Sequence, residues 1–159
     1  MHLNVRTQYS PLQSLIRIET YLDELVHRQL GRAIICETTL TGVPAFIEAC
    51  QRRQLQPVIG WEQRIEEEDC CILWFAFSSD GLRQLYRLAS EQPVIEASSL
   101  IAVLVPLRQA SEDMTRLRRS VVQWMGHVQG ARTYMGVTSS RSTVERESRM
   151  RYREVAASL

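Results

Sequence analysis

A run of polar side chains follows an apolar segment in the first third of the sequence. The apolar segment is 33–35, and the next residues are Cys36, Glu37 and two threonines. An apolar segment of this kind is typical of a buried strand, and parallel strands direct their carboxyl ends toward the mouth of an α/β fold. The thiol of Cys36 and the carboxylate of Glu37 therefore stand where such folds carry reactive groups. We interpret the segment as a working site or as the remains of one.

The elements that would position these groups alternate along the chain. Strands are predicted at 2–7, 33–36, 57–65, 71–77, 99–107 and 132–139. Helices are predicted at 10–30, 43–55, 79–91, 111–128 and 142–159, the first with Ser10 as its N-cap. This alternation predicts an α/β fold with a mainly parallel sheet or barrel. The acidic run at 66–71 predicts a solvated hairpin between the strands at 57–65 and 71–77. We expect residues 1–159 to form a single domain.

The bulk composition excludes several classes of protein. Nineteen basic residues, all of them arginine, stand against eighteen acidic residues, and a net charge of +1 gives no field that argues for nucleic acid or membrane. The apolar runs are too short to span a bilayer. The four cysteines lack CxxC spacing, and the chain starts without a signal-like segment, so we expect free thiols and a cytoplasmic location.

Several segments, in this order, resemble the N-terminal PHP (polymerase and histidinol phosphatase) domain of the bacterial DNA polymerase III alpha subunit. The opening HLNVRTQYSPLQSL is similar to the family's HLxVHSxYSxLxG. Residues 33–62 resemble ALTDHGNMFGAxxFYxACKxxGIxPIIGxE, and residues 72–90 resemble LxLLAKNxxGYxNLxxLxS. The segment RTYMGVTS is a weaker match to a strand of the FYLEL type.

The resemblance implies a distorted βα barrel of the PHP type. In the family the domain continues to a further strand with TNDVHY-like residues and then to the polymerase, whereas this sequence stops at Leu159. We therefore expect a truncated or incomplete barrel, the N-terminal part of the family's domain. It would be either a piece of a longer polymerase or a free-standing relic.

The resemblance also implies where a metal site would lie. Active PHP domains hold up to three metal ions in a ring of histidines and carboxylates and hydrolyse phosphate esters. The matching positions in this sequence are Arg6, Gln8, Cys36, Glu37, Glu62 and Cys71. Of these ligands the resemblance retains Glu62, so we expect a degenerate site without metal and without catalytic residues.

Arg6 matters most among the changes, because a guanidinium group keeps its charge and repels a divalent cation. We expect it to form an ion pair with Glu62 or Glu37 in place of metal. The alternative is that Cys36, Glu37, Glu62 and Cys71 converge and bind zinc as a rebuilt ligand set.

An arginine-rich segment of the predicted helix at 111–128 suggests a second, weaker site. Arg116, Arg118 and Arg119 are candidates for contact with nucleic acid. The similar segment 141–153 carries interleaved acidic residues, which favour ion pairs within the helix.

Three functional readings follow. The first is a scaffolding region of a replicative polymerase that is inactive alone and needs no cofactor. It would contact the rest of the polymerase or other replisome proteins, and it would contact DNA only indirectly. The second is a phosphoesterase or 3′–5′ exonuclease dependent on zinc or manganese. The third is a free-standing regulatory or decoy domain that binds polymerase partners. An incomplete barrel would also leave a sheet edge unpaired and promote self-association.

Overall fold

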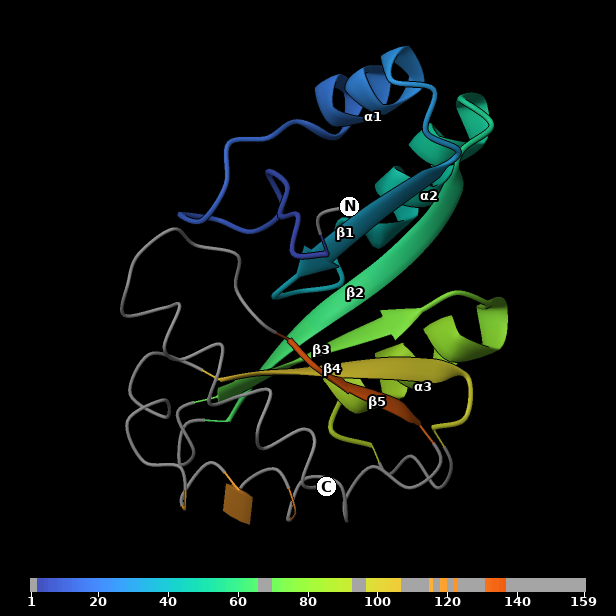
Figure 1. Cartoon of the computed structure of the whole chain (residues 1–159). Coiled ribbons are helices and arrows are strands. Elements are labelled where there is room, and N and C mark those ends of the chain that lie inside the picture. The colour runs from blue at the N-terminus through green and yellow to red at the C-terminus, as the bar shows by residue number, and fades with distance from the viewer. Residues whose placement is uncertain are drawn as a thin grey trace.

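The structure, a computed structural model, describes residues 3–65, 70–92, 97–106 and 131–136, together with residues 115, 118, 119 and 122. Its elements alternate between helices and strands, as Figure 1 shows. In chain order they are α1 (Ile18–His27), β1 (Arg32–Glu37), α2 (Val43–Arg52), β2 (Gln56–Ile65), β3 (Cys70–Ala76), α3 (Ser79–Ala89), β4 (Leu100–Pro106) and β5 (Arg132–Met135). The α/β class is confirmed. The predicted helices at 111–128 and 142–159 lie outside the continuously described residues, and none of the described helices is long and apolar enough to cross a membrane.

The described strands form one strongly twisted sheet in the order β1-β2-β3-β4-β5 (Figure 1). The outer pairs β1·β2 and β4·β5 are parallel, whereas β2·β3 and β3·β4 are antiparallel. The antiparallel pairing of β2 with β3 agrees with the hairpin expected there, whereas the prediction of a mainly parallel sheet was wrong for β3·β4, which α3 connects. A short connection of 66–69 joins β2 to β3, too short for the crossover that parallel pairing needs. The described sheet is not closed, so these strands do not show the expected barrel.

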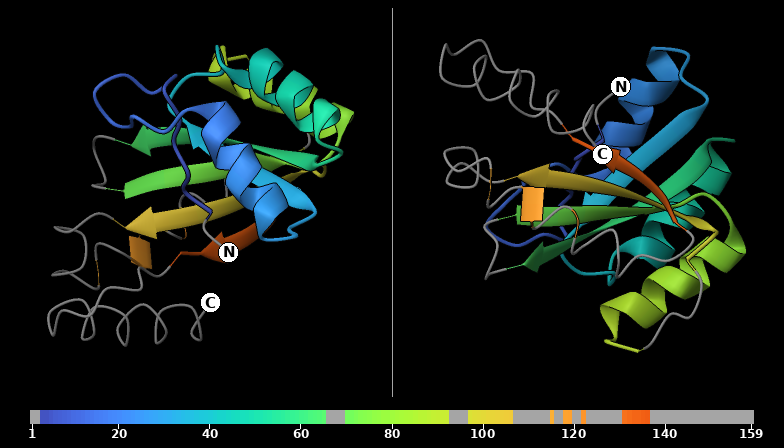
Figure 2. Two further views of the ribbon diagram at one scale, coloured as in Figure 1. Left: turned by 90° about the horizontal axis from the view of Figure 1, so that it is seen from above. Right: turned by 60° about the horizontal axis from the view of Figure 1, so that its bottom comes forward.

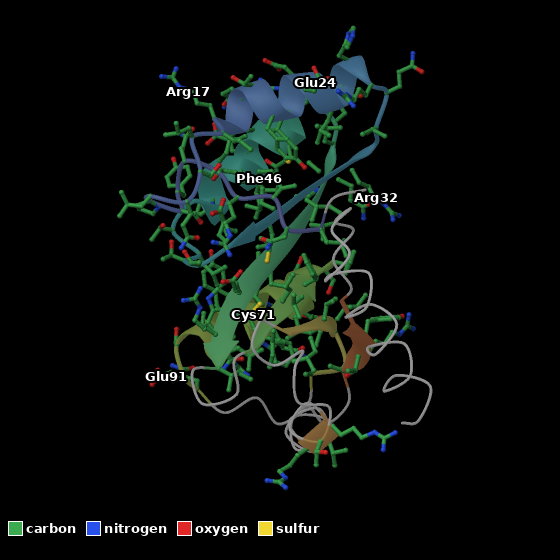
Figure 3. All side chains as sticks on the ribbon, turned by 60° about the vertical axis from the view of Figure 1, so that its left-hand side comes forward. Arg17, Glu24, Arg32, Phe46, Cys71 and Glu91 are labelled. Atoms are coloured by element: carbon green, nitrogen blue, oxygen red, sulfur yellow. The ribbon has the colours of Figure 1, made fainter. Side chains whose placement is uncertain are left out.

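Both faces of the sheet are buried. On the face that we call the helix face, Phe46 of α2, Leu85 of α3 and Leu22 of α1 pack against apolar side chains of β1 to β4. Figure 2 shows α2 and α3 on the same side of the sheet, and Figure 3 shows Phe46 between the helices and the strands. The opposite face, which we call the site face, carries a second apolar cluster that contains Ile34, Cys36, Val58, Cys71, Leu73, Phe75 and Val103.

The N-terminal residues differ from the prediction. Residues 3–7 form no strand, and the first helix begins at Ile18 instead of near Ser10. The Ser10 hydroxyl donates a hydrogen bond to Glu37, so it does not cap a helix. Leu12 has a φ of 62°, which a continuous helix cannot accommodate. Residues 3–17 instead form an irregular segment beside the carboxyl end of β1, which we call the N-terminal strap.

The outer edge of β1 is occupied by hydrogen bonds from other segments. The Tyr21 hydroxyl of α1 donates to the Ile34 carbonyl oxygen at 2.9 Å, and the Cys36 N–H donates to the Val5 carbonyl oxygen at 2.8 Å. Burial raises the pKa of the Tyr21 phenol, which keeps the hydroxyl protonated as a donor. These contacts protect an edge that would otherwise be open to pairing with another chain. Self-association stays a prediction.

Replacing Tyr21 by Phe removes the hydroxyl that caps the β1 edge. We expect the free energy of unfolding to fall by about 1 kcal/mol, because the Ile34 carbonyl loses its partner. Urea denaturation measures the change, with Tyr86→Phe on the exposed side of α3 as the matched control. Equal stabilities of the two variants would show that the Tyr21 hydroxyl contributes nothing.

Candidate functional site

Side-chain alternation along the strands separates the candidate residues into two groups. Cys36 belongs to the site face, and its neighbour Glu37 leaves β1 toward the other face. In β2, Val58 lies on the site face, and alternation places Glu62 on the same face. Cys71 of β3 lies there too, and Figure 3 shows its position on the sheet. The site face therefore collects Cys36, Glu62 and Cys71, and Glu37 stands apart.

Arg6 joins this group from the N-terminal strap. Its guanidinium forms an ion pair with Glu62, whose side chain is only 7% exposed, and also donates a hydrogen bond to the Gln13 side chain. Of the two partners expected for Arg6, the structure shows Glu62. A half-buried ion pair of this kind is screened less by solvent than a surface pair. The positive charge thus lies directly against the one carboxylate that the resemblance retains.

The two thiols of the site face are protonated at neutral pH. Burial, together with the negative charge of Glu62, raises the pKa of the Cys71 thiol to about 11. Burial and Glu62 also raise the pKa of Cys36 well above its ordinary value, while Arg6 opposes this shift. A thiolate is the form that binds metal or acts as a nucleophile. Both cysteines are therefore poorly prepared to act as nucleophiles.

Glu37 is completely buried and is held by uncharged donors of the strap. Its Oε1 accepts hydrogen bonds from the Thr7 N–H at 2.8 Å and from the Thr7 hydroxyl at 2.6 Å. Its other oxygen, Oε2, accepts one from the Ser10 hydroxyl. Thr7 and Ser10 are themselves fully buried. This carboxylate is occupied in fixing the strap to the end of β1.

The remaining candidates lie away from this group or beyond the described residues. Gln8 is exposed, and its N–H donates to the Ile16 carbonyl oxygen within the strap. Arg118 and Arg119 are exposed, and Arg116 lies outside the described residues. The structure therefore brings together Arg6, Glu62, Cys36 and Cys71 of the positions that the sequence singled out.

Among the described residues, no three or more histidine, cysteine, aspartate or glutamate side chains are grouped so as to hold a metal ion. Within the site face, the Glu62 carboxylate is bound to a guanidinium, and the neighbouring thiols are protonated. No step of a metal-dependent reaction can be derived from this arrangement.

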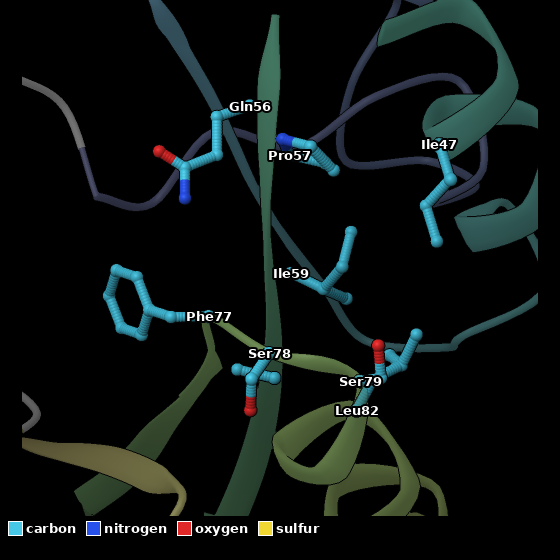
Figure 4. A pocket seen from close by; sticks show the side chains of 9 residues that line it. Ile47, Gln56, Pro57, Ile59, Phe77, Ser78, Ser79 and Leu82 are labelled. Carbon is cyan, nitrogen blue, oxygen red and sulfur yellow. The ribbon is translucent and has the colours of Figure 1, made fainter. Parts of the chain in front are cut away.

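Two surface cavities lie elsewhere. One, of about 250 Å³, opens at the amino end of β2 and is lined by Ile47, Gln56, Pro57, Ile59, Ala76, Phe77, Ser78, Ser79 and Leu82 (Figure 4). The other, of about 390 Å³, lies between the loop after β1 and α3 and is lined by Thr38, Thr39, Leu40, Thr41, Trp61, Tyr86, Ala89 and Ser90. Neither includes a charged residue, and neither contains the Arg6–Glu62 pair.

Sequence reasoning missed Thr7, Ser10 and Gln13 as partners of the candidate residues. Thr7 and Ser10 bind Glu37, and Gln13 binds Arg6. The available signal was the polar composition of residues 7–14, which favours side-chain hydrogen bonds over a buried helix. That signal does not identify an acceptor some thirty residues away in the chain.

Comparison of the sequence with known proteins identifies relatives that match part of the chain. The chain is 30% identical over 95 residues to the DNA polymerase III subunit alpha of Staphylococcus aureus strain Mu50. This aligned region covers 57% of the chain and 9% of the relative. It is 31% identical over 93 residues to the protein of the same description from Streptococcus pyogenes serotype M3, covering 55% of this chain and 9% of the relative. The chain thus matches only a small part of these relatives' length.

A family model supplies the wider match. The model described as PHP domain matches residues 2–157, which is nearly the whole sequence and includes the strap, the sheet and the Arg6–Glu62 pair. The chain belongs to the PHP domain family.

Proposed function

We propose that this PHP domain is a scaffolding region of a replicative DNA polymerase III alpha subunit, and that its former metal site is closed by an ion pair. The chain by itself would have neither polymerase nor phosphoesterase activity. Its partners would be the remainder of a polymerase or other replisome proteins, with DNA contacted only through them. A single domain over 1–159 and a place in the cytoplasm belong to the same proposal.

The observation that supports the proposal is the contact between Arg6 and Glu62. Two unit charges about 4 Å apart interact by roughly 4 kcal/mol at an effective dielectric constant of 20. A cation placed beside Arg6 would meet a repulsion of this size before it gained anything from Glu62. The ion pair also neutralises the Glu62 carboxylate, so the former site has little need of a metal.

The metal content of the purified protein distinguishes a scaffolding domain from a metal-dependent hydrolase. For protein purified without chelator, and again after soaking in zinc and manganese, we expect elemental mass spectrometry to find well under one equivalent of metal. The physical reason is that Arg6 occupies Glu62 and that the thiols of Cys36 and Cys71 stay protonated.

Matched variants make the result specific. One or more equivalents of metal that disappear in Glu62→Ala and Cys36→Ala, but persist in Glu24→Ala, would show a rebuilt ligand set. That outcome would refute the scaffold proposal in favour of a metal-dependent phosphoesterase or 3′–5′ exonuclease. Glu24 is a suitable control because it lies in an exposed ion pair with Arg28 on α1.

A further inference from the structure

The N-terminal strap is attached to the sheet mainly through two carboxylates. Glu37 accepts hydrogen bonds from Thr7 and Ser10, and Glu62 forms the ion pair with Arg6. One backbone bond is added, from the Cys36 N–H to the Val5 carbonyl oxygen at 2.8 Å. All of these contacts fall within residues 5–10 of the strap and join it to β1 and β2.

Apolar burial contributes little to this attachment. The leucines of the strap, Leu12 and Leu15, have relative exposures of 108% and 97%. Tyr9 is the strap residue that packs against the apolar cluster of the helix face. The strap also forms bonds within itself, from the Gln8 N–H to the Ile16 carbonyl oxygen and from the Ser14 hydroxyl to the Arg6 carbonyl oxygen. It is therefore a locally ordered unit that can separate from a core held by apolar packing.

The Arg6 side chain of the strap lies on the site face near both thiols, whose pKa its charge lowers against the larger effect of burial. Val5 lies beside Cys36 at the β1 edge, and the Arg6 side chain extends past that edge to reach Glu62 on β2. Cys36 is 0% exposed and Cys71 is 5% exposed. Moving Arg6 away would leave the nearly buried Glu62 carboxylate without its ionic partner.

We propose that residues 3–17 act as a latched strap that opens as a unit. The Arg6–Glu62 pair holds the strap to the site face, and the Glu37 hydrogen bonds hold it to the end of β1 on the opposite face. The closed state is the one in the structure. In the open state Arg6 and Thr7 leave their carboxylates together, because both lie in the same short stretch of chain. The rest of the sheet keeps its pairing. The latch controls access of solvent or a partner to the site face, and it does not depend on the proposed role in a polymerase.

Hydrogen exchange of backbone amides, measured by NMR on the full 159-residue chain, tests the latch. The reporters are the amides of Cys36 and Thr7, which bond to Val5 and Glu37. The Leu82 amide, bonded to Ser78 in α3, is the internal reference. In Glu62→Gln we expect Cys36 and Thr7 to exchange about tenfold faster, with Leu82 unchanged, because one of the two attachments is weakened.

Two further variants complete the design. Arg6→Gln removes the same pair from its other side and should give the same pattern as Glu62→Gln. Glu24→Gln, in the exposed pair with Arg28, should leave all three amides unchanged. Unchanged exchange at Cys36 and Thr7 in both latch variants would overturn the proposal. Equal acceleration at Leu82 would also overturn it, since the strap would then open only with the whole domain. Neither readout involves metal or polymerase, so failure here is distinct from failure of the proposed function.

Discussion

Glu37→Ala is expected to lower the free energy of unfolding by about 3 kcal/mol. The substitution removes both oxygens that accept from the Thr7 N–H, the Thr7 hydroxyl and the Ser10 hydroxyl. These donors are buried, so no water replaces the lost acceptor at low cost. The strap would lose its attachment to the end of β1. Urea denaturation followed by circular dichroism measures the loss.

Two other variants separate the causes. Glu37→Gln keeps the shape and one acceptor oxygen, so we expect a smaller loss of about 1 kcal/mol. Glu24→Ala removes an exposed carboxylate of the pair with Arg28 and should leave the free energy of unfolding close to that of the unmodified chain. If Glu37→Ala were as stable as Glu24→Ala, the buried hydrogen bonds would have no energetic role.

Gly60→Ala is the second large effect, with an expected loss of about 2–3 kcal/mol. A Cβ atom at this position would lie 2.7 Å from Cε1 of Phe75 and 2.9 Å from the Ile35 carbonyl oxygen. Phe75 is buried in the cluster of the site face, and rings in packed cores move only by displacing their neighbours. The carbonyl belongs to the backbone of β1, so relief requires a shift of the strand itself. Thermal denaturation and urea titration both measure the change.

Gly31→Ala is the matched control, because a Cβ at Gly31 meets no atom within 4 Å. We expect its stability to change by no more than about 0.5 kcal/mol. A similar loss in both variants would mean that backbone freedom, and not the contact with Phe75, determines the cost. No loss in Gly60→Ala would show that β1 and β2 can separate here without penalty.

The sequence by itself determined most of the regular elements. The segments now seen as β1, β2, β3, α2, α3 and β4 were predicted with bounds that differ by a few residues. These segments carry dense apolar runs or a helical spacing of apolar residues, and burial of that pattern dictates the element. The resemblance to PHP domains was confirmed by the match over residues 2–157. It rested on turn residues and spacings that local sequence preserves.

The pairing direction of β3 with β4 and the position of the strap were decided only in the tertiary structure. These two strands are antiparallel although α3 lies between them in the chain, an arrangement for which the alternating pattern suggested parallel strands. The apolar residues of 10–17 are spaced as in a helix. However, the Ser10 hydroxyl donates a hydrogen bond to Glu37, and Leu12 and Leu15 stay exposed. A bond to a buried carboxylate 27 residues away outweighs a weak helical propensity, and no local pattern records it.

The candidate site shows the same division. The sequence identified Arg6, Cys36, Glu62 and Cys71, and it offered Glu62 or Glu37 as the partner of Arg6. The structure resolves that choice because consecutive residues of a strand point to opposite faces. Glu62 lies on the face that Arg6 reaches, whereas Glu37 accepts hydrogen bonds from the strap. The sequence specifies the type of each residue. The charged side chains that form ion pairs are determined by the face and the register that each strand adopts in the folded sheet.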